Sequence, residues 1–265
     1  TLIKNRMADE NRVAPYFGSY YYGFYNTKAP FKNNPKLRTA LNMAIDRDIL
    51  VNIVIGAGQI PAYSFVPPVK TFQPIEPEWS TWSKEKREAE ALRLYQEAGY
   101  SKDKPLEVEI LYNTSENHKK VALAVAAMWK QALGAKTILR NQEWKVFLAN
   151  AEQTNFQICR MGWIGDYADP YTFLELLTSD CGNNHSNWSS TTYDTMLEQA
   201  NQQHDAEERL RMLREAEAFA LHEQPLIPLY VYTRTQLIKP YVRGIWGNHQ
   251  DRHPWKYMWM ERLSI

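Results

Sequence analysis

The segment LEVEILYNTSENHKKVALAVAAMWKQALG, residues 106–134, determines the fold class expected for this chain. Its first part, Leu106–Tyr112, alternates apolar residues with glutamates, which is the period of a half-buried strand. Glu116–Leu133 follows after a short polar stretch and has the pattern of a helix that ends at Gly134. The segment therefore predicts a strand followed directly by a helix.

Strand and helix patterns alternate on both sides of this segment. The other predicted strands are Ser19–Asn26, Thr137–Leu139, Phe156–Met161 and the β-rich stretch Leu226–Ile238. The other predicted helices are Pro35–Ile45, Asp48–Ile55, the segment from Ser83 to Gly99, Glu143–Ala151, Pro170–Leu177, Thr192–Gln202 and Ala206–His222. Gly56–Thr81 is rich in proline and predicts an extended surface loop. Strands separated by helices that can cover a sheet are typical of an α/β fold.

The composition is that of a globular protein. Of 265 residues, 44% are hydrophobic, and 31 basic against 30 acidic residues leave a net charge of +1. The sequence has no basic block and no nucleic-acid-binding motif, so we expect no nucleic-acid partner. The longest apolar run, Val121–Trp129, is far shorter than the roughly 20 residues that span a bilayer, and we expect no membrane span. Without an initiator methionine or a signal peptide, the chain is expected to be a piece of a longer precursor.

The segment FQICRMGWIGDYADP, residues 156–170, has the features of a binding site. A pleated strand would turn Arg160 away from its apolar face, and Gly162 lacks the side chain that would keep another backbone at a distance. Asp169 precedes a proline and has the position of a helix cap. Asp166 is not needed for that cap, and its carboxylate is therefore free to meet a cation.

The same residues also fit a purely structural interpretation. Arg160 and Asp166 would then form a surface ion pair, Trp163 would belong to the core, and Gly162 would mark a bulge. Spacing alone does not decide between the two interpretations.

The motifs of catalysis and cofactor binding are absent from the sequence. It has no G-x-S-x-G, no cysteine in a catalytic signature and no phosphate loop, so we expect neither an enzyme nor a cofactor. Cys181 and His185 form only an isolated pair in a polar loop, and we expect no metal site. His118 lies in the first turn of a predicted helix, where it either contributes to an anion site or is exposed without function. Cys159 and Cys181 are compatible with a disulfide or with two free thiols.

Several segments together resemble one protein family. They are YGFYNTKAPFKNNPKLRTALNMAIDR at 22–47, GQIPAYSFVPP at 58–68, LYNTSENHKK at 111–120, NQEWKVFL at 141–148 and the run Arg160-x-Gly162-Trp163-x-x-Asp166-Tyr167. In this order they resemble the family 5 extracellular solute-binding proteins, the oligopeptide-binding proteins of bacterial ABC importers.

The resemblance implies the fold and the division of the chain. The fold would be a type II periplasmic-binding-protein-like lobe, with a mixed sheet flanked by helices. The family's proteins are about twice this long, and the chain resembles their C-terminal half. Residues 1–18 would be a hinge or remnant of a first lobe, residues 19–235 the second ligand-binding lobe, and residues 236–265 a segment that returns to the first lobe. That last segment carries Trp246, Trp255 and Trp259, which would pack on the first lobe.

The resemblance also implies a function and site residues. The protein would be a receptor that passes short peptides to membrane permease subunits. It would be periplasmic, or a lipid-anchored cell-surface protein in a Gram-positive source. Asp166 matches the aspartate that takes the α-ammonium of the peptide, and Arg160–Ile164, including Gly162, matches the strand that pairs with the ligand. Arg160 and His118 match positions near the carboxylate end of the ligand or its bridging waters. The matched cleft-lining positions are Tyr21, Asn113, Trp144 and Trp163.

Three departures from the family pattern affect these expectations. Close relatives have a cysteine pair where Gly18 and Ile164 stand, so a bridge between Cys159 and Cys181 would replace it. Some relatives have a basic residue where Ile55 stands, and the preferred peptide length is therefore open. Receptors for dipeptides, murein peptides, haem and nickel share the fold, and a peptidase or amidase remains as an alternative from another class.

Overall fold

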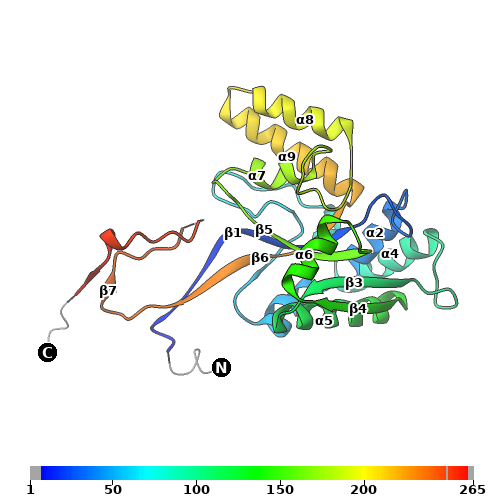
Figure 1. The fold of residues 1–265 in the computed structure, drawn as a ribbon, viewed down its shortest axis with the longest axis horizontal. Coiled ribbons are helices and arrows are strands. Elements are labelled where there is room, and N and C mark those ends of the chain that lie inside the picture. Colours follow the sequence, from blue (N-terminus) through cyan, green and yellow to red (C-terminus); the bar gives the residue numbers. More distant parts are fainter. Residues whose placement is uncertain (1–6, 249, 262–265) are drawn as a thin grey trace.

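The computed structural model describes residues 7–248 and 250–261, and its centre is a mixed sheet (Figure 1). Among these residues the sheet has six strands in the order β2-β6-β1-β5-β3-β4. The strands are β1 (Asn11–Phe24), β2 (Ile60–Pro61), β3 (Glu107–Asn113), β4 (Lys136–Gln142), β5 (Ile158–Ile164) and β6 (Leu226–Leu237). β3 is parallel to β4 and β5, whereas β1 is antiparallel to β5 and β6. The predicted α/β fold with a mixed sheet is confirmed.

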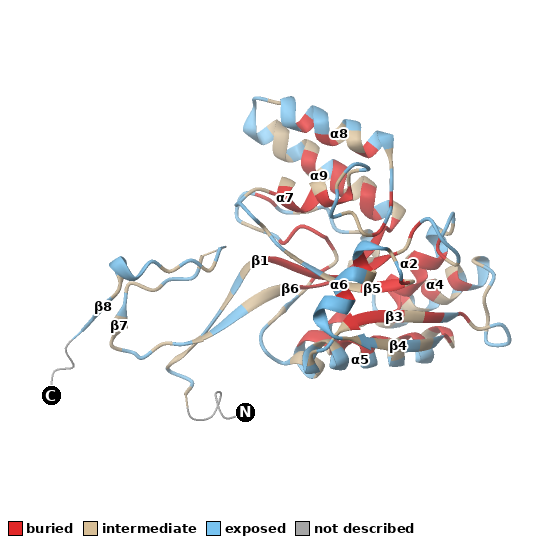
Figure 2. Cartoon of the chain, in the orientation of Figure 1, coloured by how far each residue is buried: buried red, intermediate tan, exposed pale blue. Residues whose placement is uncertain are grey.

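Helices cover the sheet in two groups (Figure 1). The α-helices are α2 (Pro35–Met43), α3 (Arg47–Ile49), α4 (Lys84–Glu97), α5 (Glu116–Leu133), α6 (Trp144–Glu152), α7 (Tyr171–Leu174), α8 (Thr191–Gln202) and α9 (Ala206–Glu223). Short 3₁₀ turns are η2 (Glu78–Thr81), η3 (Glu175–Leu177) and η4 (Trp255–Tyr257), and η1 (Leu50–Ile55) is π-helical. Buried positions concentrate where α2, α4 and α5 meet the sheet and between α7, α8 and α9 (Figure 2). None of the described helices is both long enough and apolar enough to cross a bilayer.

Local signals explain the helix boundaries. Asp46 and Ser83 cap their helices through side-chain oxygens that accept from Ile49 N and Lys86 N, at 3.1 and 3.3 Å. Gly134 ends α5 with a φ of 75°, a left-handed conformation that glycine adopts without strain. The helix predicted for Asp48–Ile55 is confirmed, although it starts at Arg47 and changes from α-helical to π-helical after Ile49.

The prediction of a surface loop for Gly56–Thr81 is wrong in part. The segment has little regular structure, but Phe65, Val66 and Phe72 are buried in the core cluster of α7, α8 and α9. Its backbone is held there by Glu217 of α9, whose Oε1 accepts from Phe65 N and Val66 N at 2.8 and 2.7 Å. The loop is therefore part of the core on this side of the sheet.

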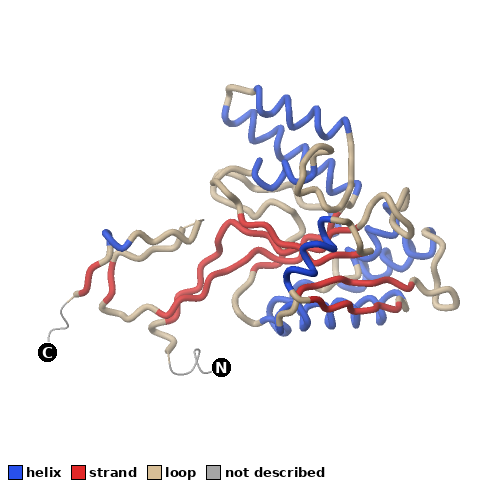
Figure 3. Tube along the Cα trace, in the orientation of Figure 1, coloured by secondary structure: helices blue, strands red, loops and turns tan. Residues whose placement is uncertain are grey.

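β1 begins well before the predicted strand Ser19–Asn26. Its first part pairs with the end of β6, from Asn11 opposite Leu237 to Pro15 opposite Thr233, and the register then shifts before Ser19. These paired ends form an arm that leaves the sheet and leads to residues 239–261, which include β7 (Val242–Arg243) and β8 (Trp259–Met260) (Figures 1 and 3).

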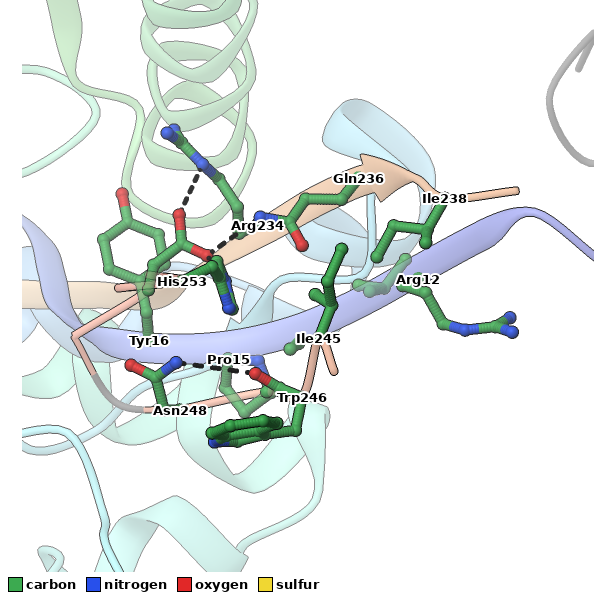
Figure 4. Close-up of a pocket in the computed structure, with 14 residues that line it drawn as sticks. Arg12, Pro15, Tyr16, Arg234, Gln236, Ile238, Ile245, Trp246, Asn248 and His253 are labelled. Atoms are coloured by element: carbon green, nitrogen blue, oxygen red, sulfur yellow. Dashed lines mark hydrogen bonds and ion pairs between the residues drawn. The ribbon is translucent and has the colours of Figure 1, made fainter. Parts of the chain in front are cut away.

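The segment beyond the arm folds back onto it (Figure 4). Asp251 accepts from Arg234 of β6 at 2.8 Å and lies 2.9 Å from Nε2 of His253. Aromatic side chains farther along remain exposed, Trp255 to 87% and Trp259 to 58%. Large exposed apolar side chains on one segment indicate a surface that packs against something else.

Candidate functional site

One edge of β5 is open beside the centre of the sheet. β5 pairs with β1 along its whole length, but with β3 only at Ile158 and Cys159. Among the described residues no strand lies on the other side of Arg160–Ile164. The amide of Gly165 donates to Phe17 O of β1 at 2.8 Å, and alternation along the strand therefore directs the backbone groups of Gly162 and Ile164 to the open side.

A cavity of about 220 Å³ lies beside this edge, between β5, α6 and the loop after η3. It brings together five of the predicted site residues, which are Tyr21, Trp144, Arg160, Gly162 and Trp163. Leu148, Asn183 and His185 also line it and were not predicted. Apolar and aromatic side chains dominate the wall, with a few polar groups, as in many sites for organic ligands.

Arg160 borders the cavity, and its side chain points to the face of the strand opposite to Met161 and Trp163, where it lies against aromatic rings. Its guanidinium donates from Nη2 to Tyr232 Oη at 2.8 Å and lies 4.8 Å from the centre of the Tyr20 ring. Nη1 is 3.5 Å from Asn113 Oδ1, and the buried Nε has no hydrogen-bond partner in the structure. No carboxylate pairs with this guanidinium in the described part of the chain. The alternative of an ion pair between Arg160 and Asp166 is therefore wrong.

His118 belongs to the same polar group. Its Nδ1 lies 3.2 Å from Tyr20 Oη. Burial, with the charge of Arg160 as a second cause, lowers the pKa of His118 to about 4. The imidazole is therefore neutral at neutral pH, while the guanidinium beside it remains charged.

Gly162 makes room for side chains of this chain. A Cβ atom at this position would lie 2.3 Å from Tyr232 Oη and 3.3 Å from Arg160 Nη2. The expectation that the missing side chain serves only the approach of another backbone is thus incomplete. Gly162 pairs in register with Tyr20, so the alternative of a bulge is wrong.

Trp163 and Asp166 lie where β5 leaves the sheet. Trp163 is partly buried, donates from Nε1 to Thr172 Oγ1 at 3.3 Å and also lines the cavity, so it is both a packing and a cavity residue. Asp166 is exposed, and only its backbone N–H is engaged, with Thr172 Oγ1 at 3.2 Å. Its carboxylate has no hydrogen bond or ion pair to the rest of the described chain.

The helix cap predicted at Asp169 is wrong by one residue, because Pro170 holds the cap position and makes no side-chain cap bond, but the Asp169 carboxylate still binds the first turn. Its Oδ1 accepts from Tyr171 N at 2.9 Å, and Arg209 binds both carboxylate oxygens at 2.7 and 3.0 Å. The helix begins at Tyr171, one residue after the predicted start. The Asp166 carboxylate takes no part in the start of this helix.

The family of the chain follows from the comparison with known proteins. Residues 1–185 match the family described as "Bacterial extracellular solute-binding proteins, family 5 Middle". The chain belongs to this family. Its members are extracellular solute-binding proteins of bacteria.

The curated relatives of this solute-binding protein include two periplasmic binding proteins whose names state a peptide ligand. It is 43% identical to the periplasmic oligopeptide-binding protein OppA of Salmonella typhimurium, over 92% of this chain and 45% of that protein. It is 41% identical to the periplasmic murein peptide-binding protein MppA of Escherichia coli, over 87% of this chain and 43% of that protein. The chain thus spans about half the length of the curated relatives it matches.

Solved structures of relatives have the same fold. The unliganded open form of MppA superposes with a TM-score of 0.89 at 38% identity, over 98% of this chain and 50% of that one. The Haemophilus influenzae OppA complex with the peptide RPPGFSPFR superposes with a TM-score of 0.87 at 35% identity, over 97% and 51%. The fold is therefore a type II periplasmic-binding-protein-like lobe.

The cysteines of this solute-binding protein do not form the bridge that the resemblance implied. Cys159 and Cys181 are free, and they belong to different hydrophobic clusters. Gly18 lies directly opposite Ile164 across β1 and β5, so cysteines at those two positions would face each other. No group of three metal-binding side chains, with or without Cys181, occurs in the described residues.

Proposed function

We propose that this chain forms part of a peptide-binding receptor of an ABC importer and holds a short peptide in extended form along the open edge of β5. The observation that carries the proposal is the stretch Arg160–Ile164, which has no strand of the described chain on one of its sides. A free carboxylate, that of Asp166, lies just beyond one end of this stretch, and a cation without a carboxylate partner, Arg160, lies at the other end. A peptide with free termini has the opposite charges at its two ends.

The charges at the two ends of the edge support one direction for the ligand. An α-ammonium at Asp166 and a carboxylate toward Arg160 place the peptide antiparallel to β5. The backbone groups of Gly162 and Ile164 would then pair with the peptide main chain, which gives affinity without reading side chains. Of the predicted residues, Tyr21, Trp144 and Trp163 line the cavity for alternate side chains, and Asn113 and His118 lie on the face of Arg160.

We further propose that residues 19–235 are one wall of the cleft. Residues 1–18 and 236–265 would connect it to a second lobe, which supplies the opposite wall and covers the exposed tryptophans. The receptor would be periplasmic, or anchored at the cell surface, and would deliver peptides to permease subunits. The free Asp166 carboxylate, which would pair with an amino terminus, favours peptides over haem or nickel as ligands.

Titration calorimetry of the full-length protein with the tripeptide Ala-Ala-Ala tests the proposal. A charge-assisted contact contributes about 1.5–3 kcal/mol, so Asp166→Asn and N-acetylation of the peptide should each weaken binding by roughly tenfold to a hundredfold. Asp103→Asn, which changes another exposed carboxylate, is the control and should leave affinity unchanged. Equal affinity of Asp166→Asn and wild type would refute the assignment of Asp166.

A further inference from the structure

We propose that Tyr232 is the positioning residue that sets the Arg160 guanidinium at the open edge of β5, ready for a carboxylate of the bound ligand. The inference rests on the proposed function, in which the peptide lies along this edge. It concerns a residue on β6 that the sequence motifs did not indicate.

The first argument is the hydrogen bonding of a partly buried cation. A buried charge is stable only when hydrogen bonds or counter-charges compensate it. For Arg160 the short contact is the one to Tyr232 Oη at 2.8 Å, since Asn113 is at 3.5 Å and Nε has no partner in the structure. The Tyr232 hydroxyl thus fixes where the guanidinium lies, together with the Tyr20 ring against which the guanidinium packs at 4.8 Å.

The second argument is that two glycines admit the Tyr232 ring. A Cβ on Gly18 would lie 2.8 Å from its Cδ2, and a Cβ on Gly162 would lie 2.3 Å from its hydroxyl. One glycine is on β1 and the other is on the strand with the open edge. In this chain a side chain at either position would require the ring or its surroundings to shift, and the ring carries the hydroxyl that holds Arg160.

The third argument is that the ring is held from several sides. It stacks on Tyr16 with ring centres 5.7 Å apart and an angle of 18° between the planes. Its edge meets the rings of Tyr20 at 6.1 Å and Tyr230 at 5.9 Å, both nearly perpendicular. A ring packed in this way keeps its hydroxyl at one place.

The hydroxyl positions the guanidinium without removing its charge. Burial raises the pKa of Tyr232, so the phenol remains neutral and does not act as a counter-ion. Arg160 Nη2 lies 3.3 Å from the point where a Cβ of Gly162 would be, which places the charge beside the backbone that faces the open side. A ligand carboxylate at the level of Gly162 would meet it there.

The binding test compares Ala-Ala-Ala with its C-terminal amide on Tyr232→Phe in the full-length protein. This substitution keeps the ring between the glycines and removes only the hydroxyl. Because a hydrogen bond to a charged group contributes substantially, affinity for the free acid should fall about tenfold or more, whereas affinity for the amide should change less than about twofold. Tyr95→Phe, which removes a buried hydroxyl that accepts from Leu106 N at 2.7 Å, is the control and should affect neither peptide.

An equal loss for the acid and the amide, or no loss for either, would overturn the inference. A second measurement does not depend on peptide binding. The Nε–H resonance of Arg160 in ¹⁵N-edited NMR, assigned by its disappearance in Arg160→Lys, should shift in Tyr232→Phe and stay in place in Tyr95→Phe. An unchanged resonance would refute the positioning role. Wild-type protein that binds neither peptide would instead refute the proposed function, while the resonance still decides the role of Tyr232.

Discussion

Glu217 of α9 should make the stability of this protein fall as the pH rises. The side chain is 1% exposed, and only one of its oxygens is used, accepting from the backbone of the loop at Phe65 and Val66. The other oxygen, Oε2, is buried without a partner among the described residues. Burial, with the charge of Glu76 as a minor cause, raises the pKa of Glu217 to about 8.

The sign of the effect follows from the two states. In the unfolded chain the carboxyl titrates near 4.5, so between pH 4.5 and 8 the native protein holds a proton that the unfolded chain has lost. The stability from protonated Glu217 is complete below pH 4.5 and is lost progressively up to pH 8. At about 1.4 kcal/mol per pH unit, the shift from 4.5 to about 8 corresponds to a loss of about 5 kcal/mol.

Glu217→Gln tests this value, because the amide cannot ionise and keeps an oxygen for the two N–H groups of the loop. Urea unfolding followed by tryptophan fluorescence at pH 5, 6, 7 and 8 gives the free energy of unfolding of both proteins. We expect the advantage of the variant over wild type to grow by several kcal/mol from pH 5 to pH 8. Glu207→Gln, an exposed position on the same helix, should show no such growth. A constant difference between Glu217→Gln and wild type would refute the reasoning.

Three further predictions concern the core, the thiols and the acid limit of stability. Arg47 is fully buried and donates to backbone carbonyls, including Pro228 O at 2.6 Å. Arg47→Met should therefore lower the free energy of unfolding in urea by about 2–4 kcal/mol, and a loss below about 1 kcal/mol would contradict a stabilising role for these hydrogen bonds. Denatured, unreduced protein should titrate two thiols per chain, from Cys159 and Cys181, and a value near zero would show a bridge. Burial lowers the pKa of His118 to about 4, so the unfolded chain binds a proton before the native protein does as the pH falls from 6.5. Wild type should therefore lose more stability between pH 6.5 and 4 than His118→Asn, and parallel curves of unfolding free energy against pH would disprove this.

Elements fixed by local signals could be predicted from the sequence. The bounds of α5, Glu116–Leu133, are those predicted, because the apolar period starts after a polar turn and a glycine ends it. Asp166 was separated from the helix start by the Asp169-Pro motif alone, and in the structure Asp169 rather than Asp166 accepts from the first helical N–H, although the cap position itself is Pro170. Such features depend on neighbours along the chain, which the sequence shows directly.

Elements fixed by distant partners could not be predicted. The start of β1 at Asn11 depends on pairing with the end of β6. The first residues of β1 do not show the alternation of apolar and polar residues that indicates a strand in the sequence. The burial of Phe65 depends on Glu217, far along the chain. Tyr232 likewise reaches Arg160 and Gly162 only through the sheet order, and nothing near it in the sequence indicates this role.

The open edge itself arises from the way the sheet divides. β3 pairs with β4 to its last residue, Asn113, but with β5 only as far as Leu111 opposite Cys159. β5 continues with its other neighbour, β1, so the two parts of the sheet separate between β3 and β5. The separation occurs at the carboxyl end of β3, beside the first residues of β5, and ligands commonly bind at the carboxyl ends of strands in α/β proteins. Arg160 reaches across the gap, and its Nη1 lies 3.5 Å from Asn113 Oδ1. The positive charge that we propose for binding the ligand's carboxylate is therefore located at the point where the sheet divides.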